Sequence, residues 1–212
     1  MMRVSLTDAG KRFNRDWIFR HISQEFHAGT GYALTGPNGS GKSTLLQVIA
    51  GALLPSEGKL SYADEKGPLP EEEQFRTITL CAPYLELIEE MTALEFLSFH
   101  ATFKPWVAGP SQETMLERVG LLAARDKQVR WYSSGMKQRL KLLQAFYSDT
   151  PVLLLDEPCT NLDQSGIDIY RSLVSELTRD RLVIVSSNDK VEYEFCGNLI
   201  WMPDYKKISA NA

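Results

Sequence analysis

The sequence of 212 residues predicts an α/β fold with a mostly parallel sheet, an antiparallel β layer near the N-terminus and a helical insertion. Short apolar runs alternate with helical patterns, and such runs suit strands that are buried on both faces. Composition favours one ordinary globular domain over residues 1–212, because 43% of the residues are hydrophobic and 24% are charged.

The strands are expected in two groups. Segment 4–26 is expected to form the antiparallel layer, because Ile22, Gln24 and Phe26 follow a two-residue period. The parallel strands are expected at five apolar runs, which are 32–35, 78–81, 152–155, 183–186 and 199–202. Ligands bind beyond the carboxyl ends of such strands, so functional residues are expected just after each run.

Residues 84–132 are expected to form a helical subdomain inserted in this α/β core. Thr92 and Glu95 have the spacing of a capping box, and a second helical pattern covers 111–120. The acidic run 71–73 follows two prolines, and we expect it to be a solvated loop.

Charge and cysteine content limit the classes of function. Lys and Arg number 23 against 27 Asp and Glu, so the net charge of −4 offers no positive field for nucleic acid, which is not an expected partner. The three cysteines form no CxxC pair, which argues against a disulfide framework or a zinc site and favours a reducing compartment. No segment approaches the roughly 18 apolar residues that span a bilayer. We therefore expect a cytoplasmic protein unless a partner holds it at a membrane.

The most specific motif follows the first predicted parallel strand and fits G-x-x-x-x-G-K-[ST]. Its glycines let backbone N–H groups point at phosphate oxygens, and the next helix adds its positive N-terminal end. Lys42 is expected to contact the β- and γ-phosphates, and Ser43 is expected to bind Mg²⁺ through its hydroxyl. The expected nucleotide-binding residues of this loop are Gly36, Pro37, Asn38, Gly39, Ser40, Gly41, Lys42, Ser43 and Thr44. The alternative is a glycine-rich turn that fits the motif by chance.

Two acids follow the apolar run 152–155. Adjacent side chains on an extended chain point in opposite directions, so Asp156 and Glu157 are expected to have different roles. Asp156 is expected to bind the metal ion, and Glu157 is expected to orient the attacking water or accept its proton. The alternative is that both acids merely end a strand in solvent.

The order of these motifs resembles that of ATP-binding cassette (ABC) proteins. Segment 132–139 resembles the family signature L-S-G-G-Q-x-Q-R, and segment 160–163 resembles the family D-loop. Phe13 lies where the family has an aromatic residue that stacks on adenine. The signature residues that would face a γ-phosphate held by a second cassette are Ser133, Ser134 and Gly135. The resemblance implies an ATPase with two ATP molecules sandwiched in a head-to-tail dimer, for which a homodimer is expected.

Several positions depart from the family pattern. Ser134 replaces a signature glycine, Met136 replaces the signature glutamine, and Pro83 stands where the Q-loop glutamine is expected. Asn188 stands at the position of the switch histidine, where its amide can bind a phosphate oxygen but cannot titrate near neutral pH. We therefore expect Asn188 in the catalytic site, with slow ATP hydrolysis that depends on dimerisation and on a partner.

The resemblance implies the separately encoded ATP-binding subunit of a membrane transporter. Such a subunit would dock on transmembrane permease subunits at the inner face of the cell membrane, with residues 84–90 as the expected contact. ATP would join two cassettes, and its hydrolysis would let them separate. Two alternatives stay open, a nucleotide-sensing cassette with weak hydrolysis and a soluble cassette protein that acts on ribosomes or DNA.

Overall fold

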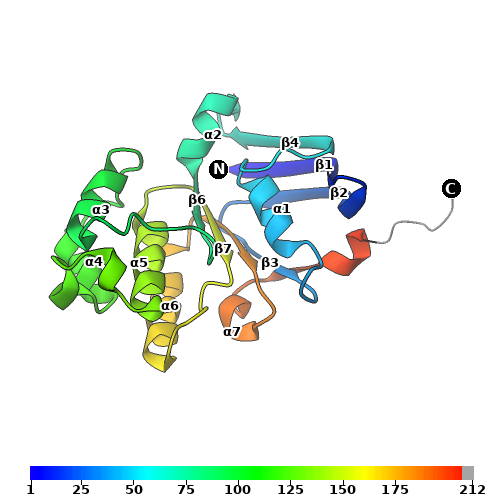
Figure 1. The fold of residues 1–212 in the computed structure, drawn as a ribbon. Coiled ribbons are helices and arrows are strands. Elements are labelled where there is room, and N and C mark those ends of the chain that lie inside the picture. Colours follow the sequence, from blue (N-terminus) through cyan, green and yellow to red (C-terminus); the bar gives the residue numbers. More distant parts are fainter. Residues whose placement is uncertain (207–212) are drawn as a thin grey trace.

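The computed structural model describes residues 1–206 and contains two sheets with helices packed on them (Figure 1). The four-stranded antiparallel sheet has the order β2-β1-β4-β5, and the five-stranded parallel sheet has the order β6-β7-β8-β3-β9. The antiparallel strands are β1 (Arg3–Phe13), β2 (Asp16–His27), β4 (Glu57–Asp64) and β5 (Gly67–Pro68). The predicted fold class is confirmed.

The parallel strands coincide with the predicted apolar runs to within a residue or two. They are β3 (Gly31–Thr35), β6 (Ile78–Cys81), β7 (Val152–Asp156), β8 (Leu182–Ser186) and β9 (Asn198–Trp201). Every residue of β7 and β8 is buried, because layers cover both faces of the sheet. These strands therefore form the rigid centre on which the functional loops are mounted.

The helices are α1 (Lys42–Ile49), α2 (Glu71–Thr77), α3 (Ala93–Ala101), α4 (Gln112–Arg118), α5 (Ser134–Tyr147), α6 (Gln164–Leu177) and α7 (Lys190–Tyr193). Short 3₁₀ turns occur at η1 (Leu122–Ala124), η2 (Val129–Trp131) and η3 (Met202–Tyr205). The capping box before α3 is present, since the Glu95 N–H donates to Thr92 Oγ1 at 3.2 Å and the Thr92 N–H donates to Glu95 Oε2 at 2.8 Å.

The prediction of a loop at 71–73 is wrong, because these acids form the first turn of α2. Negative charge at a helix N-terminus interacts favourably with the helix dipole. Arg76 complements the opposite end of α2, where it lies in the last turn. The charge run that suggested a solvated loop thus stabilises a short surface helix.

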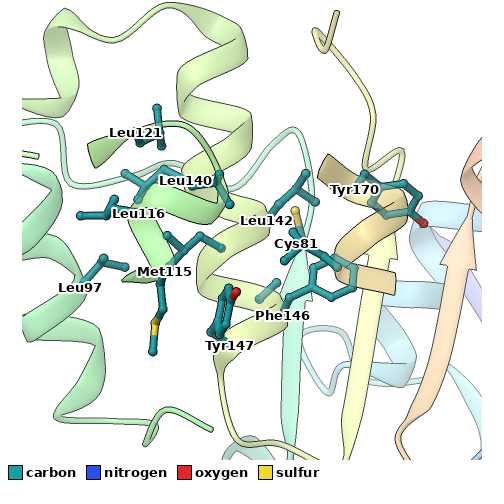
Figure 2. Packing of buried hydrophobic residues seen from close by; sticks show 14 of the residues in the cluster. Cys81, Leu97, Met115, Leu116, Leu121, Leu140, Leu142, Phe146, Tyr147 and Tyr170 are labelled. Carbon is teal, nitrogen blue, oxygen red and sulfur yellow. The ribbon is translucent and has the colours of Figure 1, made fainter. Parts of the chain in front are cut away.

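The hydrophobic core has two parts, one on each face of the parallel sheet. Along β7, Leu153 and Leu155 point into one part, whereas Val152 and Leu154 point into the other. Figure 2 shows the first part, in which α5 lies between the helices of segment 93–132 and the sheet. Leu140 of α5 faces that helical segment, and Phe146 of α5 lies with its ring centroid 6.0 Å from that of Tyr170 on α6. Helix α5 therefore packs against both the helices of segment 93–132 and the sheet.

The second part of the core lies between the antiparallel sheet, α1 and the opposite face of the parallel sheet. It fixes the start of α1, and with it the loop that precedes this helix. Within residues 1–206, no helix combines the length and the apolar composition that crossing a membrane requires.

Candidate functional site

The loop 36–44 leaves β3 at the carboxyl edge of the parallel sheet, and its last three residues form the first turn of α1. Two of its glycines are required by the geometry. Gly36 has φ +136° and its missing Cβ would lie 2.8 Å from Pro203 Cδ, while Gly41 has φ +99° and its missing Cβ would lie 2.7 Å from Ile18 Cγ2. Any larger residue would meet a neighbour as well as a strained backbone. The loop is thus held in one curled conformation.

Lys42 lies across this loop and is 6% exposed. Its Nζ donates to the Gly36 carbonyl at 2.8 Å and to the Pro37 carbonyl at 3.4 Å. Burial lowers the pKa of Lys42, whereas the negative charges of Glu157 and Asp156 raise it. Among residues 1–206 the direct partners of this cation are backbone carbonyls, which it can exchange for anionic oxygens.

Ser43 and Asp156 meet although they are 113 residues apart in the sequence. The Ser43 hydroxyl donates to Asp156 Oδ1 at 3.1 Å, and the Asp156 carboxylate at the end of β7 is 2% exposed. Burial raises the pKa of Asp156, and the hydrogen bond from Ser43 lowers it. These two oxygens form the pair that could hold a hard divalent cation.

The loop also contains a buried hydroxyl that makes no hydrogen bond within residues 1–206. Ser40 is 3% exposed, and its Oγ has no hydrogen bond within the part of the chain that the structure describes. Buried hydroxyls are normally hydrogen-bonded, so this one is available to a ligand in the loop.

Glu157 leaves the sheet in a left-handed backbone conformation with φ +42°. Its N–H donates to the Ser186 carbonyl at 2.9 Å, which anchors it to the next strand, and its side chain is exposed. A non-glycine residue rarely adopts this conformation, and such strain clusters at functional sites. The bend separates the exposed side chain of Glu157 from the buried side chain of Asp156.

Two further residues reach the loop from the end of the chain. Asn188, after β8, donates from Nδ2 to Asn38 Oδ1 at 3.1 Å. Lys206, after η3, donates from Nζ to the Gly39 carbonyl at 2.9 Å. The sequence predicts a role for Asn188 but none for Lys206, because Lys206 follows the last strand outside any motif.

The other residues that the sequence predicts for the nucleotide site lie outside the loop 36–44. Phe13 ends β1, is 46% exposed and has Lys11 Nζ 5.3 Å from its ring centroid. Ser133 caps α5 by accepting from the Met136 N–H at 3.2 Å, and no hydrogen bond of the described residues joins this helix start to the loop 36–44. Gly135 abuts segment 160–163, where its missing Cβ would lie 3.1 Å from the Asn161 carbonyl oxygen.

A separate apolar groove lies between the segment after β6 and the helices α3 and α5. We call it the α3–α5 groove, and its apolar lining includes Leu85, Leu87, Ile88, Phe96, Phe99 and Phe103. The side chains of Leu85, Ile88, Phe99 and Phe103 are 36% to 57% exposed. Large apolar side chains gathered on a surface in this way mark an interaction site.

Comparisons with known proteins agree on one family. The family model described as ABC transporter matches residues 19–160. An uncharacterized ABC transporter ATP-binding protein of Bacillus subtilis, YybJ, is 30% identical over 189 residues, covering 88% of this chain and 86% of that protein. The cytochrome c biogenesis ATP-binding export protein CcmA of Haemophilus influenzae is 31% identical over 196 residues, covering 89% of this chain and 90% of that protein. A dimeric bacterial ABC transporter cassette, MJ0796, shares the fold with a TM-score of 0.79 at 22% identity, covering 93% of each chain.

Proposed function

The chain belongs to the ABC transporter family as an ATP-binding subunit with ATPase activity, and from this premise we propose how its residues bind and hydrolyse ATP. The observation that carries the proposal is the meeting of Lys42, Ser43 and Asp156 at the carboxyl edge of the parallel sheet. A phosphate-binding loop, a buried cation and a buried carboxylate at one edge form a triphosphate site.

ATP binds with its phosphates in the loop 36–44. Lys42 exchanges the Gly36 carbonyl for phosphate oxygens, and the unpartnered Ser40 hydroxyl is available to donate to the same anion. Phe13 supplies the aromatic surface for adenine, because an exposed ring at the end of β1 can stack on a base.

Ser43 and Asp156 are the residues that would hold Mg²⁺. Their hydroxyl and carboxylate oxygens are donors of the type that this ion prefers. Within residues 1–206 no cluster of three His, Cys, Asp or Glu side chains gathers, and Mg²⁺ normally takes its other ligands from phosphates and water. When bound there, Mg²⁺ would neutralise part of the negative charge on the phosphates during hydrolysis.

Hydrolysis is completed by the exposed residues around the loop. Glu157 accepts a proton from the attacking water. The Asn188 side-chain N–H, which donates a hydrogen bond to Asn38 in the structure, breaks that bond and donates to an oxygen of the γ-phosphate instead. Ser133, Ser134 and Gly135 act on the nucleotide of a second copy of the chain, because they form the start of α5 and the N-terminal end of a helix attracts anions.

The α3–α5 groove receives a transmembrane permease subunit. Its exposed apolar side chains match an apolar segment of a partner, and this contact would hold the chain at the inner face of the cell membrane. Movement after hydrolysis would then pass to the permease through segment 84–90.

Equilibrium binding of ATP with Mg²⁺ to the purified chain tests the nucleotide site. Lys42→Ala should weaken binding about 100-fold, because several charge-assisted hydrogen bonds are lost together. Lys59→Ala removes an exposed lysine of β4 and should leave the affinity unchanged. Equal affinity of the Lys42 variant and the original chain would contradict the proposal.

Purification from membranes with a tagged chain tests the partner. We expect recovery of a protein that has several apolar segments of about 20 residues. Recovery with ribosomes alone would replace the transporter assignment by that of a soluble cassette protein.

A further inference from the structure

The chain turns sharply at Glu157. The Thr160 N–H donates to the Glu157 carbonyl at 3.1 Å, so residues 157–160 form a β-turn with Pro158 and Cys159 at its two central positions. Proline suits the first central position, because its ring fixes φ near the value that the turn needs. The turn starts at the left-handed residue Glu157, and its conformation therefore decides where the exposed Glu157 side chain points.

The peptide unit at the centre of this turn is held by two buried side chains. Gln138 of α5 donates from Nε2 to the Pro158 carbonyl at 2.7 Å. Glu192 of α7 accepts at Oε1 from the Cys159 N–H at 2.6 Å. That carbonyl and that N–H belong to the same peptide bond, so both of its polar groups are bonded to side chains of different helices. Gln138 is 3% exposed and Glu192 is 4% exposed, so water has little access to either bond.

The helices that hold the turn also carry or adjoin predicted site residues. The start of α5, one turn before Gln138, contains the signature residues 133–135. Helix α7 begins two residues after Asn188, and its Glu192 carbonyl accepts from the Tyr170 hydroxyl of α6 at 2.5 Å. The central peptide of the turn is thus fastened to the signature helix on one side and to the segment after β8 on the other.

We propose that Gln138 and Glu192 are positioning residues that fix the direction of Glu157 toward the attacking water. The inference rests on the proposed role of Glu157 as the proton acceptor. The central peptide of a β-turn can rotate while the ends of the turn stay in place, which changes the dihedral angles of both central residues. A donor bonded to its carbonyl and an acceptor bonded to its N–H hold it in one orientation. The exposed Glu157 carboxylate then keeps one direction, on which proton transfer depends.

Steady-state ATP turnover of the assembled complex tests this role through kcat and KM. Gln138→Met keeps the length of the side chain but removes the donor to the Pro158 carbonyl. It should lower kcat about tenfold, because slight misplacement of a proton acceptor slows the reaction steeply, and leave KM nearly unchanged, because the loop 36–44 is untouched. Gln74→Met is the matched control, since the Gln74 amide donates to the Leu69 carbonyl at 3.3 Å beside α2, and it should change neither value.

Two variants of Glu192 separate hydrogen bonding from packing. Glu192→Gln keeps an oxygen that can accept from the Cys159 N–H and should retain most of the turnover, whereas Glu192→Met should lower kcat about tenfold. Thermal melting shows which variants fold, and the two Glu192 variants decide if Gln138→Met does not. Equal losses in both Glu192 variants would overturn the role of the hydrogen bond, and so would an unchanged kcat in the folded methionine variants.

Combination with Glu157→Gln shows whether the two side chains act through Glu157. Glu157→Gln already removes the proton acceptor, so adding Gln138→Met or Glu192→Met should lower the residual turnover little further. A second loss as large as in the original chain would overturn the positioning role while leaving the role of Glu157 in place. Full turnover of Glu157→Gln itself would overturn the role of Glu157 and this inference together.

Discussion

Two segments leave the same edge of the parallel sheet, and their conformations are fixed in different ways. The loop 36–44 is shaped by its own residues, through left-handed glycines and the bond from Lys42 to the Gly36 carbonyl. The segment 82–88 is held by Lys141 of α5, which is more than 50 residues away in the sequence. A loop that binds phosphate with its backbone can thus be defined locally, whereas a loop that meets a partner depends on tertiary contacts.

The two segments also differ in what they expose. Lys42 is 6% exposed and Asp156 is 2% exposed, so the nucleotide side is polar and enclosed. Leu85 is 38% exposed and Ile88 is 36% exposed, so the groove side is apolar and open. We therefore expect changes in the first region to affect ATP chemistry and changes in the second to affect assembly, and three experiments test that separation.

The largest effect is expected from Glu157→Gln, measured as ATP turnover of the assembled complex. Loss of the proton acceptor should reduce turnover by about 100-fold or more, while ATP binding is retained because Lys42, Ser43 and Asp156 are untouched. Glu71→Gln in the first turn of α2 is the control, and it should leave turnover unchanged. Unchanged turnover of Glu157→Gln with occupied sites would remove Glu157 from the mechanism.

A smaller effect, on assembly alone, is expected from Ile88→Asp. A charge in the α3–α5 groove should reduce recovery of the complex with its membrane partner about tenfold, because an apolar contact is replaced by a buried carboxylate. Leu54→Asp is the matched control, since Leu54 is 79% exposed outside the groove. Equal losses for the two variants would show that the groove is not the docking surface, and reduced ATP binding by Ile88→Asp would break the proposed separation.

Much of the fold could be predicted because its signals are local. The parallel strands are apolar runs buried on both faces, and the caps at Thr92 and Ser133 follow from residue spacing. Helix α2 could not be recognised, because three acids after two prolines fit a solvated loop as well as a first helical turn. Its tertiary context decides between these two structures.

The candidate site likewise contains residues that could be predicted from the sequence and residues that could not. The motif predicts Lys42 and Ser43 as site residues, and the end of the β7 strand predicts Asp156. In the structure Ser43 contacts Asp156, and Lys42 lies across the same loop, although their roles stay predictions. The sequence gives no indication that Lys206 reaches the Gly39 carbonyl. That contact depends on how the last turn, η3, places a residue that belongs to no motif.

The smallest effect is expected from Asn188→His, which changes a departure from the family pattern whose side chain bonds to the phosphate loop. Asn188 donates to Asn38 at 3.1 Å as a neutral amide, whereas an imidazole can also carry a positive charge toward the γ-phosphate. Charge-assisted hydrogen bonds are about twice as strong as neutral ones, so turnover of the assembled complex should rise about threefold. The gain should be greatest below the ordinary histidine pKa of about 6.5 and fade as pH rises above it, because the neutral ring loses the extra attraction. Asn188→Ala, which removes the bond to Asn38 without adding a charge, should lower turnover in the same assay. A fall in turnover with Asn188→His at every pH would mean that the loop after β8 is shaped for an amide, and would favour a nucleotide-sensing cassette with weak hydrolysis.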